Sequence, residues 1–202
     1  MTLKISKYLL QFEVEMDMEK LTLKLSMLFS LASAGRCNEL TDLKTNLAFR
    51  NKDGIRLKLT KHKKQRKSTQ YPGYLDIPSY PDNILMCPVS CYDWYLVKTA
   101  GYRVFNEDDD FVFRALSHPH GKITPSTISR WLRKAISEAG FDLTVADVAH
   151  SVRGIAATKA KASGMSIRQI MTAVEWNTNS VFHQHYYNQK FDPTFGREVL
   201  KY

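Results

Sequence analysis

Residues 18–45 read MEKLTLKLSMLFSLASAGRCNELTDLKT, and the expected fold is built outward from this stretch. Its apolar residues recur at helical spacing as far as Ala34, which predicts a helix over 18–34. Gly35 follows at a point where a helix ends or bends, and a second, short helix is expected over 39–43. Arg36 therefore lies in the turn between two predicted helices.

Three short strands are expected directly after these helices. The segments NLAFRN (46–51), GIRLKLT (54–60) and YPGYLDIP (71–78) carry β-branched, aromatic and alternating residues, and the turn KDG and a basic loop separate them. A further short strand and an irregular loop are expected over 106–123. Helical patterns cover 87–101, 124–140, 151–164, 166–176, 179–190 and 192–202, with Thr124 and Ser166 as expected N-caps. The sequence predicts an α+β fold, mainly helical, with a small antiparallel three-stranded sheet, as one domain over 1–202.

The charge balance favours a polyanion as partner. The chain has 29 Lys and Arg residues against 20 Asp and Glu, a formal net charge of +9, and nucleic acid is the leading candidate. The apolar stretches are too short to span a membrane, and the N-terminus has no signal-peptide pattern, so we expect an intracellular protein. The three cysteines, Cys37, Cys87 and Cys91, lack the further Cys or His ligands of a zinc site, and we expect reduced thiols and no metal.

The segment AHSVRG places His150 and Arg153 three residues apart in a predicted helix. This spacing puts both side chains on one helical face, where they can converge on one phosphate. Taken alone, the pair is equally compatible with a histidine at a helix start and a solvated arginine.

These features together resemble the tyrosine recombinase (phage integrase) family, and the resemblance covers nearly the whole chain. The segment AGRCNEL resembles the family's first arginine motif, LTKHKKQR resembles the β-hairpin that carries its lysine, and HSVRG matches its His-x-x-Arg motif. The segment MCPVSCYDWYL resembles a helix start that is common in the family. The resemblance implies the family's catalytic domain, and we expect that the family's separate N-terminal core-binding domain, a DNA clamp, is not part of this chain.

The resemblance also implies a reaction. A tyrosine hydroxyl attacks a DNA phosphodiester and forms a 3′-phosphotyrosyl intermediate, with no metal, ATP, cofactor or small-molecule substrate. The implied phosphate ligands are Arg36 and Arg153, since a planar guanidinium binds two phosphate oxygens and favours the charge of the transition state. His150 would accept the tyrosine proton or bind the phosphate. Lys61 or Lys63 would protonate the leaving 5′ oxygen; each matches one family alignment.

The late aromatic residues match less closely. Trp176 stands where many members have a second histidine, as a phosphate ligand or as a packed core side chain. Tyr186 follows it by ten positions and Tyr187 by eleven. The spacing of ten is similar to recombinases of Crypton and DIRS-like mobile elements, so we favour Tyr186 as nucleophile, with Tyr187 as the alternative. The same spacing favours a nuclear protein over a bacterial cytoplasmic one.

The expected function is therefore site-specific recombination or integration of a mobile element. The expected partners are double-stranded DNA and further copies of the chain, assembled as a synaptic tetramer. The alternatives are a domesticated, catalytically silent DNA-binding module and a relaxing enzyme of the type IB topoisomerase kind. The DNA-binding candidates outside the catalytic set are basic: Lys58, Lys64, Arg66, Lys67, Arg130 and Arg133.

Overall fold

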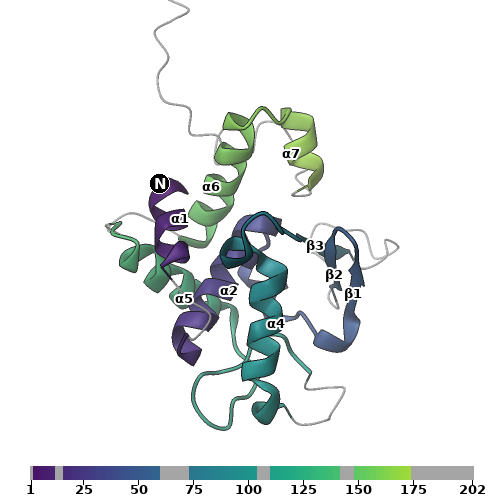
Figure 1. The fold of residues 1–202 in the computed structure, drawn as a ribbon, viewed down its shortest axis with the longest axis vertical. Helices are drawn as coiled ribbons and strands as arrows, with labels where there is room; N and C mark the ends of the chain where they lie inside the picture. The colour runs from purple at the N-terminus through teal and green to yellow at the C-terminus, as the bar shows by residue number, and fades with distance from the viewer. Residues whose placement is uncertain (1, 12–15, 60–72, 104–109, 142–147, 174–202) are drawn as a thin grey trace, which may run out of the picture.

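The computed structural model describes residues 2–11, 16–59, 73–103, 110–141 and 148–173 (Figure 1). The α-helices there are α1 (Thr2–Leu10), α2 (Met18–Ser33), α3 (Cys37–Thr41), α4 (Pro88–Lys98), α5 (Pro125–Glu138), α6 (Val148–Ala162) and α7 (Ile167–Ala173). The strands are β1 (Ala48–Asn51), β2 (Gly54–Lys58) and β3 (Tyr74–Pro78), and the 3-10 helices are η1 (Thr45–Leu47), η2 (Ile84–Met86) and η3 (Ala100–Tyr102). None of the described helices is long and apolar enough to cross a membrane.

Helix α2 is the centre of the fold. All its residues from Leu21 to Ser30 are buried, and it packs against α4, α5, α6 and β3 (Figure 1). A helix that is buried on all sides belongs to the interior of a domain. The hydroxyls of Thr22 and Ser26 therefore donate to carbonyl oxygens of α2 itself. The helix predicted over 18–34 is confirmed and ends at Ser33.

The predicted sheet is also confirmed. The strand order is β1-β2-β3, both pairs are antiparallel, and Arg56 lies between Phe49 and Asp76 in the register. The buried residues of β2 and β3 alternate with exposed ones, so the sheet covers the core with one face. At the β1–β2 turn, Gly54 has a φ of +152°, and a Cβ there would lie 2.1 Å from the carbonyl oxygen of Ile77. Only glycine fits this turn.

Several expectations need correction. Helix α1 was not expected from the sequence. The short helix expected over 39–43 begins at Cys37, because the Glu39 side chain accepts the Arg36 amide hydrogen and caps an earlier first turn. Residues 110–123 contain isolated bridges, Lys44 with Phe111 and Arg114 with Lys122, and no strand. The helices expected over 179–190 and 192–202 lie outside the described residues.

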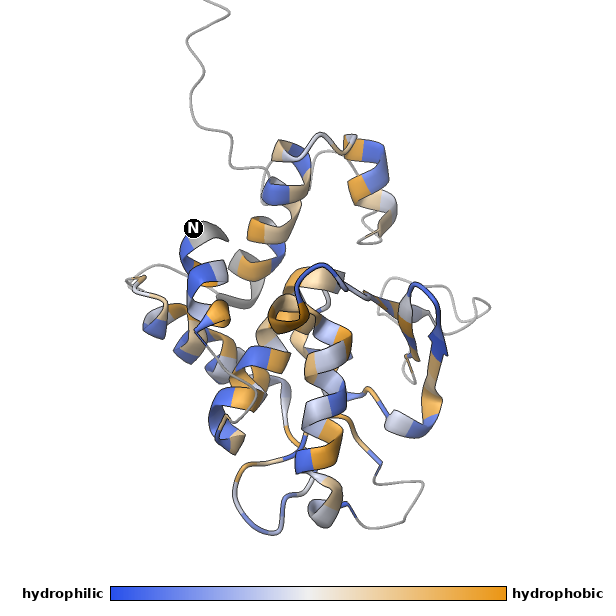
Figure 2. Cartoon of the chain, viewed as in Figure 1, coloured by the Kyte–Doolittle hydropathy of each residue, from blue (hydrophilic) through white to orange (hydrophobic). Residues whose placement is uncertain are grey.

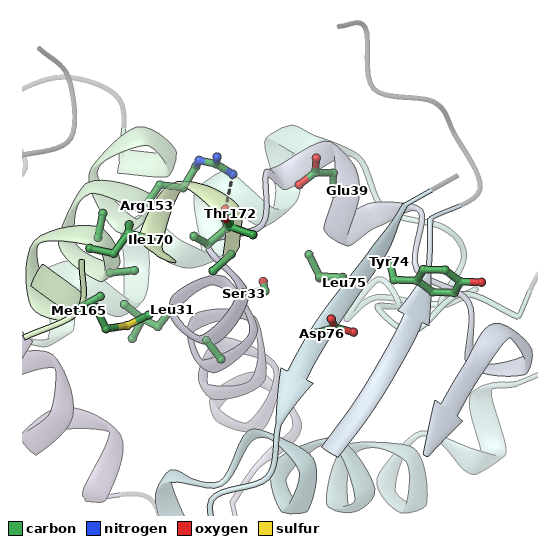
Figure 3. Close-up of a pocket in the computed structure, with 16 residues that line it drawn as sticks. Leu31, Ser33, Glu39, Tyr74, Leu75, Asp76, Arg153, Met165, Ile170 and Thr172 are labelled. Carbon is green, nitrogen blue, oxygen red and sulfur yellow. Dashed lines mark hydrogen bonds between the residues drawn. The ribbon is translucent and has the colours of Figure 1, made fainter. Parts of the chain in front are cut away.

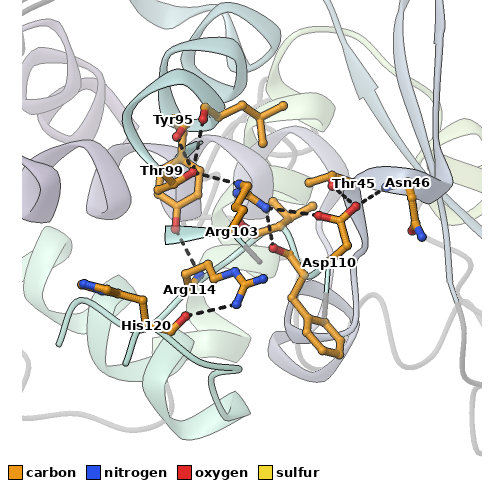
Figure 4. A network of polar contacts seen from close by, with 11 residues as sticks. Thr45, Asn46, Tyr95, Thr99, Arg103, Asp110, Arg114 and His120 are labelled. Carbon is orange, nitrogen blue, oxygen red and sulfur yellow. Dashed lines mark hydrogen bonds and ion pairs between the residues drawn. The ribbon is translucent and has the colours of Figure 1, made fainter. Parts of the chain in front are cut away.

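A polar network around Arg103 replaces the expected strand. The Arg103 guanidinium donates to the carbonyl oxygens of Phe111 at 2.9 Å and Val112 at 3.0 Å, and lies 3.6 Å from a carboxylate oxygen of Asp110 (Figure 4). Asp110 accepts hydrogen bonds from the Thr45 hydroxyl and the Asn46 amide. Side-chain bonds thus satisfy backbone groups that a strand would have paired with a neighbouring strand.

The last two described helices form an arm beside the main core. Helix α6 packs on α2 and α5, whereas α7 packs on α6 (Figure 1). The contact between α6 and α7 is a separate hydrophobic cluster in which Ala157 and Ile170 are buried. Both helices of the arm carry apolar as well as hydrophilic residues (Figure 2). The helix predicted over 151–164 is confirmed as α6 and begins earlier, at Val148.

Candidate active site

Arg36 stands at the turn between α2 and α3. Its amide hydrogen bonds to Glu39 Oε2 at 2.8 Å, and its Nη1 donates to Glu39 Oε1 at 3.1 Å. The Glu39 side chain is 8% exposed, while that of Arg36 is 37% exposed. Glu39 therefore orients Arg36 from the interior, and the guanidinium keeps access to solvent.

Arg153 reaches the same turn from α6. Its side chain is buried, 4% exposed, and its Nη1 donates to the carbonyl oxygen of Ala34, a bond that spans 119 positions of the chain. The interpretation of Arg153 as a solvated helix residue is therefore wrong. Arg153 lies against the backbone two residues before Arg36, so the fold brings the two predicted phosphate ligands to one end of α2.

His150 lies in the first turn of α6, three positions before Arg153. Residues three apart in an α-helix share a face. The backbone therefore places His150 on the face of α6 that carries Arg153, as the sequence pattern predicted.

A pocket of about 510 Å³ opens beside this turn (Figure 3). The end of α2, strand β3 and the arm of α6 and α7 form its walls, and Arg153 and Glu39 contribute its charged groups near the turn. Much of the remaining lining is apolar: Leu31, Leu75, Ala156, Ala157, Ala160, Met165 and Ile170. Arg153 is almost completely buried and lines this pocket from the α6 side.

The sheet leads toward the predicted basic hairpin. Lys58 is the last residue of β2, is half-buried, and pairs with Tyr74 in the register. Two positions earlier in β2, Arg56 donates to both carboxylate oxygens of Asp76, at 2.7 and 3.1 Å. These bonds join β2 to β3 where the chain leaves the sheet. Five predicted basic residues lie outside the described residues: Lys61, Lys63, Lys64, Arg66 and Lys67.

Arg130 and Arg133 are exposed on α5, away from its buried residues Ile128, Trp131 and Leu132. Their role as DNA-binding residues stays a prediction. Trp176, Tyr186 and Tyr187 lie outside the described residues. Among the predicted site residues, the structure brings together Arg36, Arg153 and the backbone of His150.

The described part of the chain contains no cluster of three or more His, Cys, Asp or Glu residues that is able to hold a metal ion. The cysteines are free thiols. Burial raises the pKa of Cys91 to about 12. Burial also opposes ionisation of Cys87, but hydrogen bonds from Ser90, Tyr80 and Ser79 outweigh it and lower the pKa of Cys87. Cys87 is the N-cap of α4, and its sulfur accepts the Ser90 amide hydrogen in the first turn of that helix.

Two residues beside the arginines were not predicted from the sequence. Ser33 bonds to the turn, and Ala34 supplies the carbonyl oxygen that binds Arg153. A local signal existed only for Ser33, a small hydroxyl residue two positions before Gly35. The role of Ala34 depends on a contact with α6 that sequence spacing does not show.

The sequence matches the model of the phage integrase family over residues 4–192. The chain belongs to the phage integrase family. A search of curated proteins by sequence returned no match.

Solved structures share the fold of this phage integrase domain. The XerA recombinase structure is 19% identical with a TM-score of 0.60, and the match covers 92% of this chain and 64% of that one. The XerH site-specific recombinase bound to its difH substrate is 16% identical with a TM-score of 0.64, and the coverage is 98% and 50%. The Tn1549 transposon integrase in complex with circular intermediate DNA is 14% identical with a TM-score of 0.57, covering 97% and 62%. The chain thus spans less than two thirds of each of these relatives.

Proposed function

We propose that this chain is the catalytic part of a site-specific DNA recombinase that serves a mobile element. The observation that carries the proposal is the convergence of Arg36 and Arg153 on one turn beside a pocket. Two guanidinium groups held by the protein suit a phosphodiester, because each binds two oxygens and remains charged at any relevant pH. Membership of the phage integrase family supports the same reaction class.

The proposed reaction conserves the energy of the cut phosphodiester bond. The hydroxyl oxygen of Tyr186 bonds to the phosphorus, its proton passes to a base such as His150, and the bond from phosphorus to the 5′ oxygen breaks. The leaving oxygen takes a proton from Lys61 or Lys63. A second DNA 5′-hydroxyl later attacks the phosphotyrosine and releases the tyrosine. Arg36 and Arg153 stabilise the extra negative charge on the phosphorane-like transition state.

Tyr186 is the favoured nucleophile because it follows Trp176 by ten positions. The likeness to recombinases of Crypton and DIRS-like elements, and with it a nuclear location, belongs to the proposal and rests on that spacing. Adjacent helical positions point about 100° apart, so Tyr186 and Tyr187 do not both face one phosphate if that segment is helical.

The proposed working form is a synaptic tetramer on double-stranded DNA. Strand exchange between two duplexes requires four cuts, which argues for four copies. Support comes from a structure of similar fold, a lambda integrase tetramer bound to a Holliday junction, which is 13% identical with a TM-score of 0.54.

Trapping of a covalent adduct tests the proposal. The protein is incubated with a pool of nicked duplexes whose arms are randomised, so that a cut strand loses its short 5′-hydroxyl fragment and cannot be rejoined. Protein–DNA adducts are isolated on a denaturing gel, and their DNA is sequenced. We expect an adduct that Tyr186→Phe abolishes and Tyr187→Phe leaves intact. Arg36→Lys and Arg153→Lys should each slow it by about 10²–10³, as loss of a transition-state donor does.

The alternatives give different outcomes. DNA binding without any adduct would identify a silent DNA-binding module. Relaxation of supercoiled plasmid that carries none of the selected sequences would indicate a topoisomerase-like activity. An adduct lost only with Tyr187→Phe would keep the reaction and move the nucleophile by one position.

A further inference from the structure

Ser33, the last residue of α2, bonds to both sides of the point where the helix ends. Its hydroxyl donates to the carbonyl oxygen of Phe29 at 2.6 Å and accepts the amide hydrogen of Gly35 at 3.0 Å. A hydroxyl has one hydrogen and two lone pairs, so it fills both roles at once. The side chain thus ties the last turn of α2 to the turn that follows it.

That turn has little room to move. Ala34 has a φ of +49°, which reverses the chain sharply. A Cβ on Gly35 would lie 3.0 Å from Ser33 Oγ and 3.2 Å from Leu75 Cδ1, so the Gly35 backbone sits closely between Ser33 and β3. Figure 3 shows Ser33 and Leu75 on the same side of the pocket.

Both arginines are attached to this turn. Arg36 follows Gly35 directly, and its amide is held by Glu39. Arg153 donates to the carbonyl oxygen of Ala34. A shift of the peptides at Ala34 and Gly35 therefore changes the position of Arg36 relative to Arg153.

We propose that Ser33 is a positioning residue whose hydroxyl locks the turn and so sets the separation of the Arg36 and Arg153 guanidinium groups. The inference rests on the proposed function, because that separation matters only if both groups bind one phosphate. A misplacement of about 1 Å costs on the order of 10²-fold in rate when reacting groups must be aligned.

The test compares two DNAs of the sequence selected by adduct trapping. One has an ordinary phosphate at the cut position and the other a methylphosphonate, in which a methyl group replaces a non-bridging oxygen and removes the negative charge. We expect Ser33→Ala to slow adduct formation about 10- to 100-fold on the phosphate. On the methylphosphonate, where the cations have less charge to stabilise, Ser33→Ala and the wild type should react at similar rates. Ser33→Thr, which keeps the hydroxyl, should behave like the wild type on both.

Ser26→Ala is the matched control. Ser26 lies on the same helix and donates to the carbonyl oxygen of Leu23 at 2.9 Å, but it does not bond to the turn. It should leave both rates unchanged. Amide hydrogen exchange supplies a readout without reaction: Gly35 should exchange faster in Ser33→Ala and at the wild-type rate in Ser26→Ala.

Other results would overturn the inference. If the wild type forms the adduct and Ser33→Ala forms it equally fast on the phosphate DNA, the positioning role is refuted while the proposed function stands. The same holds if Ser33→Ala slows adduct formation by the same factor on both DNAs. A wild type that forms no adduct with any duplex refutes the proposed function and this inference with it. If Ser33→Ala shows no cooperative thermal transition, it is not folded, and Ser33→Cys is used in its place. The thiol of this variant forms only weak hydrogen bonds.

Discussion

At the scale of single residues, Ala34 has the most unusual backbone among the residues that shape the site. Its φ of +49° and ψ of +30° lie in the left-handed region. This conformation destabilises the folded state by about 1–2 kcal/mol for a residue other than glycine. A glycine avoids that cost, but its more flexible unfolded chain lowers the free energy of unfolding by about 0.4–1 kcal/mol. We expect Ala34→Gly to raise the free energy of unfolding by up to about 1 kcal/mol.

Urea unfolding at constant m-value measures this change. The matched control is Ala135→Gly, because Ala135 is equally buried but lies inside α5. That variant should lose about 1 kcal/mol, the ordinary cost of glycine in a helix. Equal losses in the two variants would contradict the role assigned to the left-handed turn.

Tyr92 gives a prediction about alkaline pH. Its side chain is 1% exposed, and burial raises the pKa of Tyr92 to about 12 from 10.0. Between those values the folded protein keeps the proton and the unfolded chain has lost it, so stability falls as pH rises. Below pH 10 the hydroxyl is neutral in both states and has no effect. Tyr92 thus contributes a slope of up to about 1.4 kcal/mol per pH unit between pH 10 and 12.

Tyr92→Phe should remove this part of the slope, measured as the urea midpoint at several alkaline pH values. Other buried acids add to the alkaline loss, among them Cys91, whose pKa burial raises to about 12. The variant should therefore be less sensitive to alkali than the wild type without being insensitive. An unchanged slope would show that the Tyr92 hydroxyl does not titrate in this range.

At the scale of helices and strands, the Arg103 network binds the backbone of a segment that was expected to be a strand. The Arg103 side chain is 14% exposed, and its guanidinium bonds to two backbone carbonyl oxygens. Arg103→Met would leave Asp110 without its cation and those carbonyls without their donor. Because buried polar groups are costly to leave unpaired, the free energy of unfolding should fall by about 2–4 kcal/mol.

Arg50→Met is the comparison for Arg103. Arg50 also pairs with a carboxylate, that of Asp93, but both side chains are about half exposed, and such pairs contribute less than about 1 kcal/mol. Chemical denaturation of the two variants ranks the pairs. Similar losses would mean that the network in Figure 4 stabilises the fold no more than a surface ion pair does.

Elements that depend on residues close in sequence were predicted more accurately than features that depend on contacts between separate elements. The Thr124 cap, the end of α2 and the alternation in β2 and β3 depend on near neighbours, so the sequence predicted them. The strand expected in 106–123 is not found in the described residues 110–123. Arg103, eight positions before Phe111, and Tyr95, nineteen before Arg114, take backbone hydrogen bonds of that segment, and the local alternation of residues does not show these partners. The spacing of His150 and Arg153 indicated a shared face, but the burial of Arg153 depends on α2 and was not predictable.

At the scale of the whole molecule, a net charge of +9 predicts binding to DNA that weakens as salt rises. Arg130 and Arg133 are exposed on one helix and were predicted to bind DNA. In Arg130→Gln/Arg133→Gln, the slope of log K against log salt should become shallower by about 2, close to 1 for each lost phosphate contact. Fluorescence anisotropy with a duplex over a series of salt concentrations measures it.

Lys134→Gln is the control for this measurement. Lys134 is the next residue on α5 and is partly exposed, but its ammonium group pairs with Glu19 and Glu138. Its loss should leave the slope unchanged. A change of about 1 in the slope for Lys134→Gln, half that of the double variant, would show that overall charge, and not contact by Arg130 and Arg133, sets the salt dependence.

The bond between Arg153 and the Ala34 carbonyl has a consequence for a chain that is still being made. The two ends of this bond lie 119 positions apart, so at about 5–20 residues per second the ribosome needs on the order of ten seconds to add the second after the first. Throughout that interval a nascent chain displays Arg36 alone. A product of interrupted translation or of proteolysis ahead of α6 is in the same condition: it retains basic surface for DNA but lacks the second cation. In the proposed reaction, cutting would thus be withheld until nearly the whole domain has been synthesised and folded.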